Sequence, residues 1–470
     1  MNWRSRSFFL WPVFVLAVFC SEAAEVHIQA RHPEWANLTF EIFTIADPVV
    51  HARQVLATAD TDETGFFEVR FSLEETRQIY IEQGVYRLYF YARPGRSYRL
   101  ILPPFREKSQ EEWLNPYFQP SVVHLATQDE DSTGLNALIR NFDRYFQPVY
   151  EELAVQVYGR REVEGVERAI DQLERRFPPD TGFFAEYKRY RLTSLRVLQC
   201  QQESRVLNQH ALPDGPPDWN NPAYHDLFSQ TFMRVFRKLD ADGSFSPVLQ
   251  EIYSEKDLGL LIASLKERLG LKSGPLVEMI AVKGLYDACH DGDISASMAA
   301  HFLEELAESG SGGEVRHCAL HVHERLTRLL PGSPAPRLLP VGRNKEEGYL
   351  NSLRGKYVYL VFGSPRSYTF LRELPLIRQI AARFGENLQV LLVMAGAGDS
   401  RDDLFAGDST GIRVMYTEYG NGVMERYRVR AFPSYFLIDR EGKMVWAPAP
   451  SPLEHFSEKF SRLVKSASGK

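Results

Sequence analysis

The chain has 470 residues, of which 44% are hydrophobic and 25% charged, with a formal net charge of −6. This is the composition of a globular protein, and the length suffices for about two to four domains with separate cores. A mildly acidic chain without a strongly basic stripe is poorly suited to displacing counterions from phosphates, which excludes nucleic-acid binding from the expected functions.

The N-terminus has the features of an export signal. Arg4 and Arg6 precede an apolar run over residues 8–19, and Ser21 and Ala23 supply small residues for a signal peptidase. The run is shorter than the roughly 20 residues of a membrane-spanning helix, so we expect a signal peptide over residues 1–23 rather than an anchor. Lipidation at Cys20 is less favoured than simple cleavage, because bulky Phe19 precedes it. No other stretch of the mature chain is apolar enough to span a bilayer, and we expect a location in the periplasm or cell envelope of a Gram-negative bacterium.

Three cysteines remain beyond this signal: Cys200, Cys289 and Cys318. They would permit one disulfide and one free thiol, but three scattered cysteines do not make a disulfide framework. We interpret them as small buried apolar residues.

Residues 24–125 are predicted to form an all-β module. Short runs rich in Val, Ile, Phe and Tyr are separated by turn residues, at the spacing of a small β-sandwich. The predicted strands are residues 25–30, 38–45, 54–58, 66–71, 85–92 and 97–102. Residues 62–67 resemble the D-x-x-G-x-F turn of carboxypeptidase-regulatory or prealbumin-like domains, which usually serve as adhesion or spacer modules.

Residues 130–330 show helical periodicity. Apolar residues recur at i, i+3, i+4 and i+7, for example in 135–146 and 258–269, and predict an all-α domain of seven to nine helices. After a Pro- and Gly-rich linker, residues 332–466 return to short apolar strands around an amphipathic helix at 369–384. Strands at 357–362, 388–394, 412–416, 435–438 and 444–446, with a closing helix at 452–465, predict an α/β sandwich of thioredoxin type.

Three motifs in this last segment resemble the exported thioredoxin-like proteins of the thiol:disulfide oxidoreductase and alkyl-hydroperoxide-reductase group. Residues 332–336 match G-x-x-A-P, residues 353–362 match L-x-G-K-x-x-x-L-x-F, and residues 433–442 match P-[ST]-x-F-[LV]-I-D-x-x-G. The resemblance covers about the last 130 residues. It implies a thioredoxin-like domain in which Pro433 follows a cis peptide bond.

The catalytic motif of this family is absent. Where the family has W-C-x-x-C-x-x-E-x-P, Glu373 and Pro375 keep the register, and Ser367 and Phe370 replace the two cysteines. The alternative peroxiredoxin register puts Arg372 at the peroxidatic position. No cysteine follows Cys318, so neither register supplies a thiolate nucleophile. We therefore predict no catalytic residue and no cofactor, and a serine-nucleophile enzyme is disfavoured because His455 is the only histidine of the domain.

The groove beside the family's cis-proline binds extended peptides and does not require sulfur. We therefore hypothesise a redox-inactive binding or assembly module with a peptide or an envelope protein as its partner. Its candidate contact residues are Arg366, Ser367, Tyr368, Phe370, Phe432 and Pro433. Within this set, Tyr368 is expected to be exposed, whereas Phe370 is expected to fill the space of the missing disulfide.

Three alternatives stay open. The first is an oxidoreductase that uses cysteines of the helical domain or other non-standard chemistry, and the second is a surface or carbohydrate-binding protein acting through the β-module. The third is a metal site on His317 and His321 with His290 or Cys289, but solvated histidines are favoured and no metal is expected.

Overall fold

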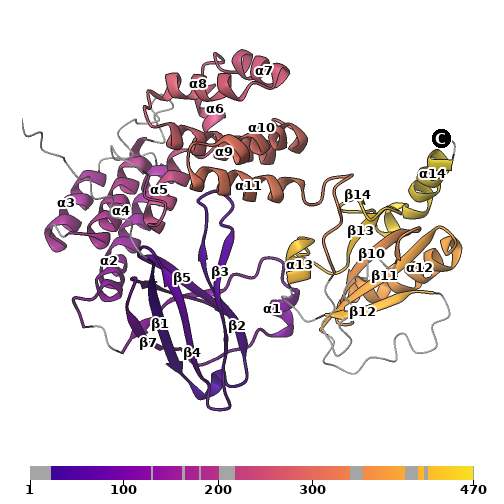
Figure 1. Cartoon of the computed structure of the whole chain (residues 1–470), viewed down its shortest axis with the longest axis horizontal. Helices are drawn as coiled ribbons and strands as arrows, with labels where there is room; N and C mark the ends of the chain where they lie inside the picture. Colours follow the sequence, from indigo (N-terminus) through magenta and orange to yellow (C-terminus); the bar gives the residue numbers. More distant parts are fainter. Residues whose placement is uncertain are drawn as a thin grey trace, which may run out of the picture.

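The computed structural model describes residues 23–128, 131–160, 165–178, 181–200, 217–338, 353–396, 411–417 and 422–468. Residues 1–22 of the predicted signal peptide lie outside this set. The chain has N-terminal sheets, a helical middle and a mixed C-terminal sheet (Figure 1). Among the helices of the described residues, none has both the length and the apolar character needed to cross a membrane.

Two sheets form the N-terminal part. One has the strand order β4 (Phe66–Leu73), β1 (Ala24–Arg31), β7 (Ser97–Ile101) and β9 (Ala126–Thr127). The other has the order β3 (Arg53–Asp60), β2 (Thr39–Ile45), β5 (Arg77–Gln83), β6 (Tyr86–Ala92) and β8 (Ser121–His124). Alternate residues of β4 are buried, as expected of a strand with one face on a core, and Ile28, Trp35 and Phe90 lie in that core. The predicted strands are present, and β5, β8 and β9 were not predicted.

The D-x-x-G-x-F turn has a clear physical basis. The Asp62 carboxylate accepts hydrogen bonds from the backbone N–H groups of Thr64 (2.8 Å) and Phe66 (2.9 Å). Gly65 has φ +70°, and an added Cβ there would lie 1.8 Å from the His32 carbonyl oxygen. The turn therefore requires an acceptor at its first position and glycine at its fourth.

The middle of the chain is helical, with a π-helical segment (Gln156–Arg160) after α2. The described residues form more helices than the seven to nine predicted, because α6 is a single turn without a periodic pattern. They are α2 (Leu135–Val155), α3 (Val166–Arg176), α4 (Phe183–Cys200), α5 (Pro222–Thr231), α6 (Val235–Leu239), α7 (Ser246–Glu255), α8 (Leu258–Leu269), α9 (Gly274–Asp291), α10 (Ala296–Ser309) and α11 (Gly313–Thr327). A five-residue helix, α1 (Gln110–Leu114), precedes them.

The β-module and the helices share a core. Val49 and Tyr91 of the β-module belong to the same apolar cluster as the helical residues, and the β2–β3 hairpin reaches α11 (Figure 1). The buried Asp47 carboxylate in this hairpin accepts hydrogen bonds from three backbone N–H groups and lies 3.2 Å from Nδ1 of His321. Burial alone would raise the pKa of Asp47, but the bonds from His321 and the backbone outweigh it and lower the pKa. The carboxylate therefore fixes the hairpin on α11.

The C-terminal sheet has the order β12 (Arg413–Thr417), β11 (Leu388–Ala395), β10 (Tyr357–Gly363), β13 (Ser434–Ile438) and β14 (Met444–Trp446). The strands β10, β11 and β12 are parallel, and β13 and β14 run antiparallel to their neighbours. Two separate apolar clusters lie on the sheet: one includes residues of α12 (Tyr368–Phe384) and α14 (Phe456–Ser468), and the other includes residues of α13 (Gly422–Arg426). The arrangement agrees with the strand and helix pattern of the sequence.

The linker between the helices and this sheet is held by hydrogen bonds. The Gly332 N–H donates to the Met444 carbonyl (2.7 Å), and the Ala335 N–H donates to the Gly442 carbonyl (2.9 Å). The Tyr427 hydroxyl donates to the Pro336 carbonyl (2.8 Å). The end of α11 is thereby held close to β14 and α13.

Candidate functional site

Ser367 acts as the N-cap of α12. Its Oγ accepts a hydrogen bond from the Phe370 N–H (3.3 Å) and donates one to the Phe432 carbonyl (2.8 Å). Serine favours this position because its hydroxyl satisfies a backbone donor that the first helical turn leaves unpaired. The side chain at the predicted nucleophile position therefore joins the helix N-terminus to the segment before Pro433.

Phe370 occupies the predicted position of the second cysteine and is completely buried. Its ring lies against Gly363 of β10, where an added Cβ would be 2.5 Å from Cε2 of the ring. Leu374 and Ile377 continue the same buried face of α12. The expectation that Phe370 fills the core is confirmed, and its inclusion among the partner-contacting residues is corrected, because no part of the ring reaches the surface.

The other predicted residues are spread around the helix start. Tyr368 is 75% exposed, as expected, and Arg366 is also exposed. Phe432 is half-buried against the apolar cluster that includes residues of α13. The Phe432–Pro433 peptide bond is cis, as the resemblance implies.

A groove of about 680 Å³ runs beside Pro433. Of the residues predicted from the sequence to contact a partner, Pro433 lines this groove. The other walls of the groove come from α12, the β13–β14 region and the end of the helical part. The lining residues are Leu326, Leu329, Leu330, Thr369, Glu373, Tyr427, Arg428, Pro433, Ser434, Tyr435, Phe436, Ala447, Pro448, Ala449, Ser451 and Glu454. A second hollow of about 590 Å³ shares Pro448, Ala449 and Glu454 with it and extends to Lys459. The two hollows therefore adjoin at these three residues.

Glu373 is a buried carboxylate in this groove. It accepts a hydrogen bond from the Tyr435 hydroxyl, and the Tyr435 ring is stacked on Tyr359, whose hydroxyl donates to the Pro450 carbonyl (2.8 Å). Burial, followed by the bond to Glu373, raises the pKa of Tyr435 far above its ordinary value. Tyr435 therefore stays protonated and donates to Glu373, which fixes the acid in the groove wall.

The described cysteines are poor nucleophiles. Cys318 is fully buried with its Sγ 3.8 Å from Asp47, and burial followed by the Asp47 charge raises the pKa of its thiol well above the ordinary value. Burial also raises the pKa of the Cys289 thiol. Because reactivity requires the thiolate, neither residue is activated. The side chain of Cys200 lies outside the described residues.

The described histidines do not form a metal site. His321 contacts Asp47, and Nδ1 of His455 lies 3.6 Å from the Glu458 carboxylate. Within the part of the chain that the structure describes, no group of three or more His, Cys, Asp or Glu side chains is arranged to hold a metal ion.

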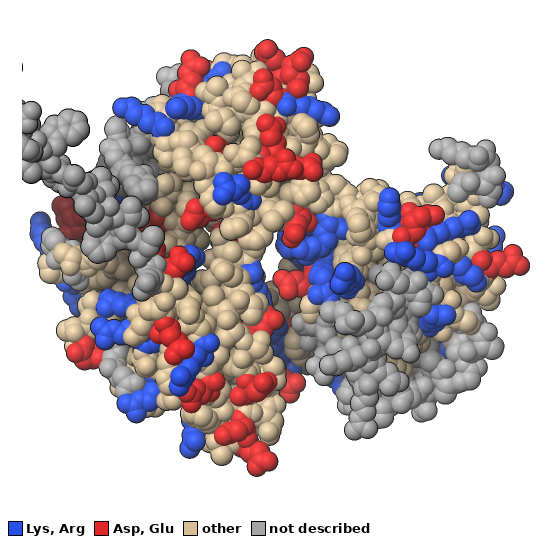
Figure 2. Space-filling model, in the orientation of Figure 1, with Lys and Arg blue, Asp and Glu red and all other residues tan. Residues whose placement is uncertain are grey.

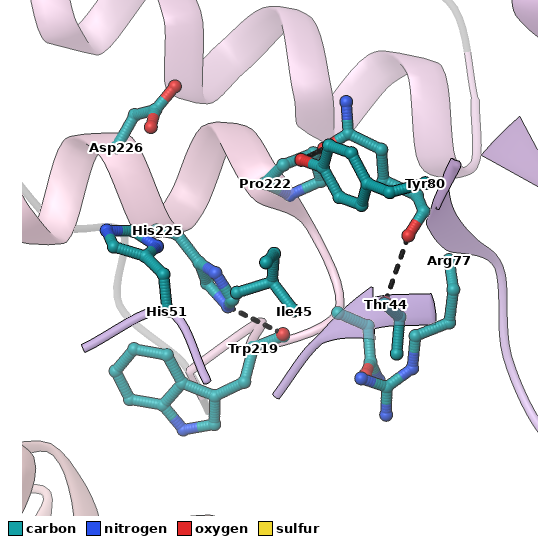
Figure 3. A pocket seen from close by; sticks show the side chains of 11 residues that line it. Thr44, Ile45, His51, Arg77, Tyr80, Trp219, Pro222, His225 and Asp226 are labelled. Carbon is teal, nitrogen blue, oxygen red and sulfur yellow. Dashed lines mark hydrogen bonds between the residues drawn. The ribbon is translucent and has the colours of Figure 1, made fainter. Parts of the chain in front are cut away.

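A second, smaller cavity of about 130 Å³ lies between the second sheet and α5. Figure 3 shows His51, His225 and Asp226 on one side of it and Arg77 and Tyr80 on the other. The His225 ring lies 2.7 Å from the Trp219 carbonyl, and burial lowers the pKa of His225 to about 4, so the ring is neutral and donates through Nε2. The cavity has room for a few water molecules.

No protein-family model matches the sequence, and the search of curated proteins finds no match. Solved structures similar to part of the chain include a thiol:disulfide interchange protein from a Bacteroides species, at 23% identity and TM-score 0.24. The thioredoxin domain of a thiol-disulfide oxidoreductase from Bacteroides vulgatus has 25% identity and TM-score 0.23. The exposed lipoprotein thioredoxin Etrx1 of Streptococcus pneumoniae has 27% identity and TM-score 0.20. The three matches cover 28%, 28% and 24% of this chain and 91%, 98% and 87% of the respective structures.

These neighbours are thioredoxin-like domains of thiol–disulfide oxidoreductases and related proteins. The present site differs in its own residues. A helix N-terminus and a cis-proline are juxtaposed, but serine and phenylalanine occupy the two positions at which the resemblance places cysteines. No sequence pattern indicated that α11 and Arg428 contribute to the groove, because their contributions depend on how the helical part and the sheet meet.

Proposed function

We propose that the C-terminal segment is a redox-inactive, thioredoxin-like binding module of an exported envelope protein, and that it holds an extended peptide in the groove beside Pro433. The observation that carries this proposal is the groove beside Pro433, which is present although Ser367 and Phe370 stand at the two cysteine positions of the motif. An extended peptide suits such a groove because its backbone groups and alternate side chains can both be accommodated.

The contacts of Ser367 and Phe370 support binding rather than catalysis. The Ser367 hydroxyl is engaged as an N-cap and as a donor to Phe432, and no base accompanies it among its described contacts. Phe370 is a core residue. Thiol exchange would need a thiolate, and Cys289 and Cys318 both have raised thiol pKa values.

The mixed lining of the groove also favours a peptide. Leu326, Leu329 and Leu330 give an apolar wall, while Thr369 and Ser434 offer hydroxyl groups. Peptide sites combine apolar contact area with a few polar groups that fix orientation. The predicted export signal supports a location of this module outside the cytoplasm.

Photo-crosslinking in intact cells tests the proposal. A photoreactive residue at Ser451, in the groove wall, should trap a discrete partner, whereas the same group at Val155, an exposed residue of α2, should not. Thr369→Trp, which places an indole in the groove from an exposed position, should abolish the adduct. An adduct unaffected by Thr369→Trp, or none above the Val155 control, would refute peptide binding in the groove.

A redox assay tests the oxidoreductase alternative. The purified protein should not reduce insulin disulfides, and replacing Cys200, Cys289 and Cys318 by Ala should change no activity measured in the same assay. Disulfide reduction that disappears in the triple variant would establish thiol chemistry instead.

A further inference from the structure

A cluster of arginines surrounds Arg428, which lines the groove. Arg325 and Arg328 lie at the end of α11, and Arg428 and Arg430 follow α13. Arg428 lines the groove directly. Burial lowers the pKa of Arg428, and the positive charges of Arg325, Arg328 and Arg430 lower it further. Figure 2 shows Lys and Arg side chains gathered at the junction between the helical part and the C-terminal part, over the position of α13 in Figure 1.

Among the described residues, one ion pair joins this cluster to an acidic side chain. Glu324 lies 3.8 Å from Arg328, and its side chain is 55% exposed. Such an exposed and loosely spaced ion pair is weak, because solvent screens it. Arg325, Arg328 and Arg430 each repel the charge of Arg428, and an external anion beside Arg428 would relieve this repulsion.

The backbone holds Arg428 in place. Its φ is +53°, a left-handed conformation that is uncommon for residues other than glycine. Hydrogen bonds from the Arg428 N–H to the Glu425 carbonyl (3.0 Å) and from the Val429 N–H to the Met424 carbonyl (2.8 Å) maintain it. The preceding Tyr427 is buried and bonded to Pro336. The guanidinium therefore projects from a fixed point at the groove mouth.

Acidic side chains line the groove as well. Glu373 and Glu454 belong to its walls together with Arg428. An acidic group of a ligand is therefore attracted to Arg428 and repelled by Glu373 and Glu454, which favours one placement of an extended ligand. Next to the arginines, Leu326, Leu329 and Leu330 offer an aliphatic wall for a neighbouring apolar side chain.

We propose that the occupant of the groove is an extended peptide with Asp or Glu side chains beside Arg428 and an adjacent aliphatic residue against Leu326, Leu329 and Leu330. This inference rests on the proposed peptide-binding function and adds the chemistry of the partner. Guanidinium groups bind carboxylates in a bidentate manner, so a cluster of them favours acidic segments over neutral ones.

Selection from a random nonapeptide library tests the inference. Peptides displayed with both ends joined to a coat protein have no free C-terminal carboxylate, so any acidic preference comes from side chains. The library is selected on the purified protein and on the groove-blocked Thr369→Trp variant. Peptides recovered by the purified protein and not by the Thr369→Trp variant should be enriched in Asp and Glu beside an aliphatic residue.

The recovered peptides are then synthesised and their affinities measured by fluorescence anisotropy. Arg325→Gln combined with Arg428→Asn should weaken binding about ten- to hundredfold for each guanidinium that had bound a peptide carboxylate. Asparagine is chosen at 428 because it tolerates a positive φ. Arg383→Gln, which changes an exposed arginine of α12, serves as the matched control and should leave affinity unchanged.

The outcomes separate the two proposals. Groove-dependent peptides without acidic enrichment, or acidic peptides insensitive to the Arg325 and Arg428 changes, would overturn the present inference and leave peptide binding intact. A selection that recovers no peptide dependent on an open groove would overturn both.

Discussion

Replacing Phe370 by Ala should destabilise the C-terminal part strongly. The change removes six ring carbons from a side chain with no exposed surface. At about 0.8 kcal/mol for each carbon group, the burial that disappears is worth roughly 5 kcal/mol, and measured Phe→Ala changes in cores span about 3–5 kcal/mol. The upper part of that range is expected, because β10, against which the ring packs, is bonded to β11 on one side and β13 on the other and cannot move into the cavity.

Hydrogen exchange measured by mass spectrometry reports this destabilisation locally. Backbone amides of β10 and α12 should exchange roughly 700- to 4000-fold faster in Phe370→Ala, because a loss of about 4–5 kcal/mol at 1.4 kcal/mol for each factor of ten gives this range. Tyr368→Ala is the matched control on the same helical turn. Its side chain is 75% exposed, so the stability change should stay within about 0.5 kcal/mol.

A β10 exchange rate that is unchanged in Phe370→Ala would refute the interpretation of Phe370 as a core residue. Gly363→Ala gives an independent check, because its Cβ would collide with the Phe370 ring. That variant should be destabilised alone and partly rescued by Phe370→Leu, which makes room for the added methyl group.

Three further outcomes are expected. Ser367→Ala should cost about 1 kcal/mol of stability, measured as a lower Tm, because the change removes the N-cap of α12. Ser367→Thr should retain most of that stability. Equal Tm values for the wild type and both variants would contradict the capping role. Tyr435→Phe should cost about 1–3 kcal/mol in urea unfolding by leaving Glu373 buried without its donor, and adding Glu373→Leu should recover part of that stability. Burial lowers the pKa of both His124 and His225 to about 4 from 6.5, so the unfolded chain binds more protons between these pH values. The contribution of these two neutral histidines to the free energy of unfolding should be complete above pH 6.5 and should fall as the pH drops toward 4. A urea midpoint that does not change across this pH range would contradict this prediction.

Local sequence patterns predicted the elements of this protein because hydrophobic periodicity depends on neighbours a few residues apart. The strands β10 and β11 are continuous apolar runs, and both were identified in this way. Short elements such as α6 and α13 carry too few residues for a period to be visible, and they were missed.

The sequence alone also determined which residues stand at the two cysteine positions that the resemblance implies. The register set by Glu373 and Pro375 puts Ser367 and Phe370 at the cysteine positions, and no later cysteine exists. The burial of Phe370 followed from the same helix, since Leu374 and Ile377 lie on its face at i+4 and i+7.

Only the tertiary structure decided what surrounds that position. The groove combines Leu326 with Pro433 and Glu454, which both lie more than 100 positions later in the chain, and the arginine cluster joins the end of α11 to the segment after α13. Asp47 and His321 are brought together in the same way. Such contacts depend on how separate elements pack, and a period within one helix or strand carries no information about its distant neighbours.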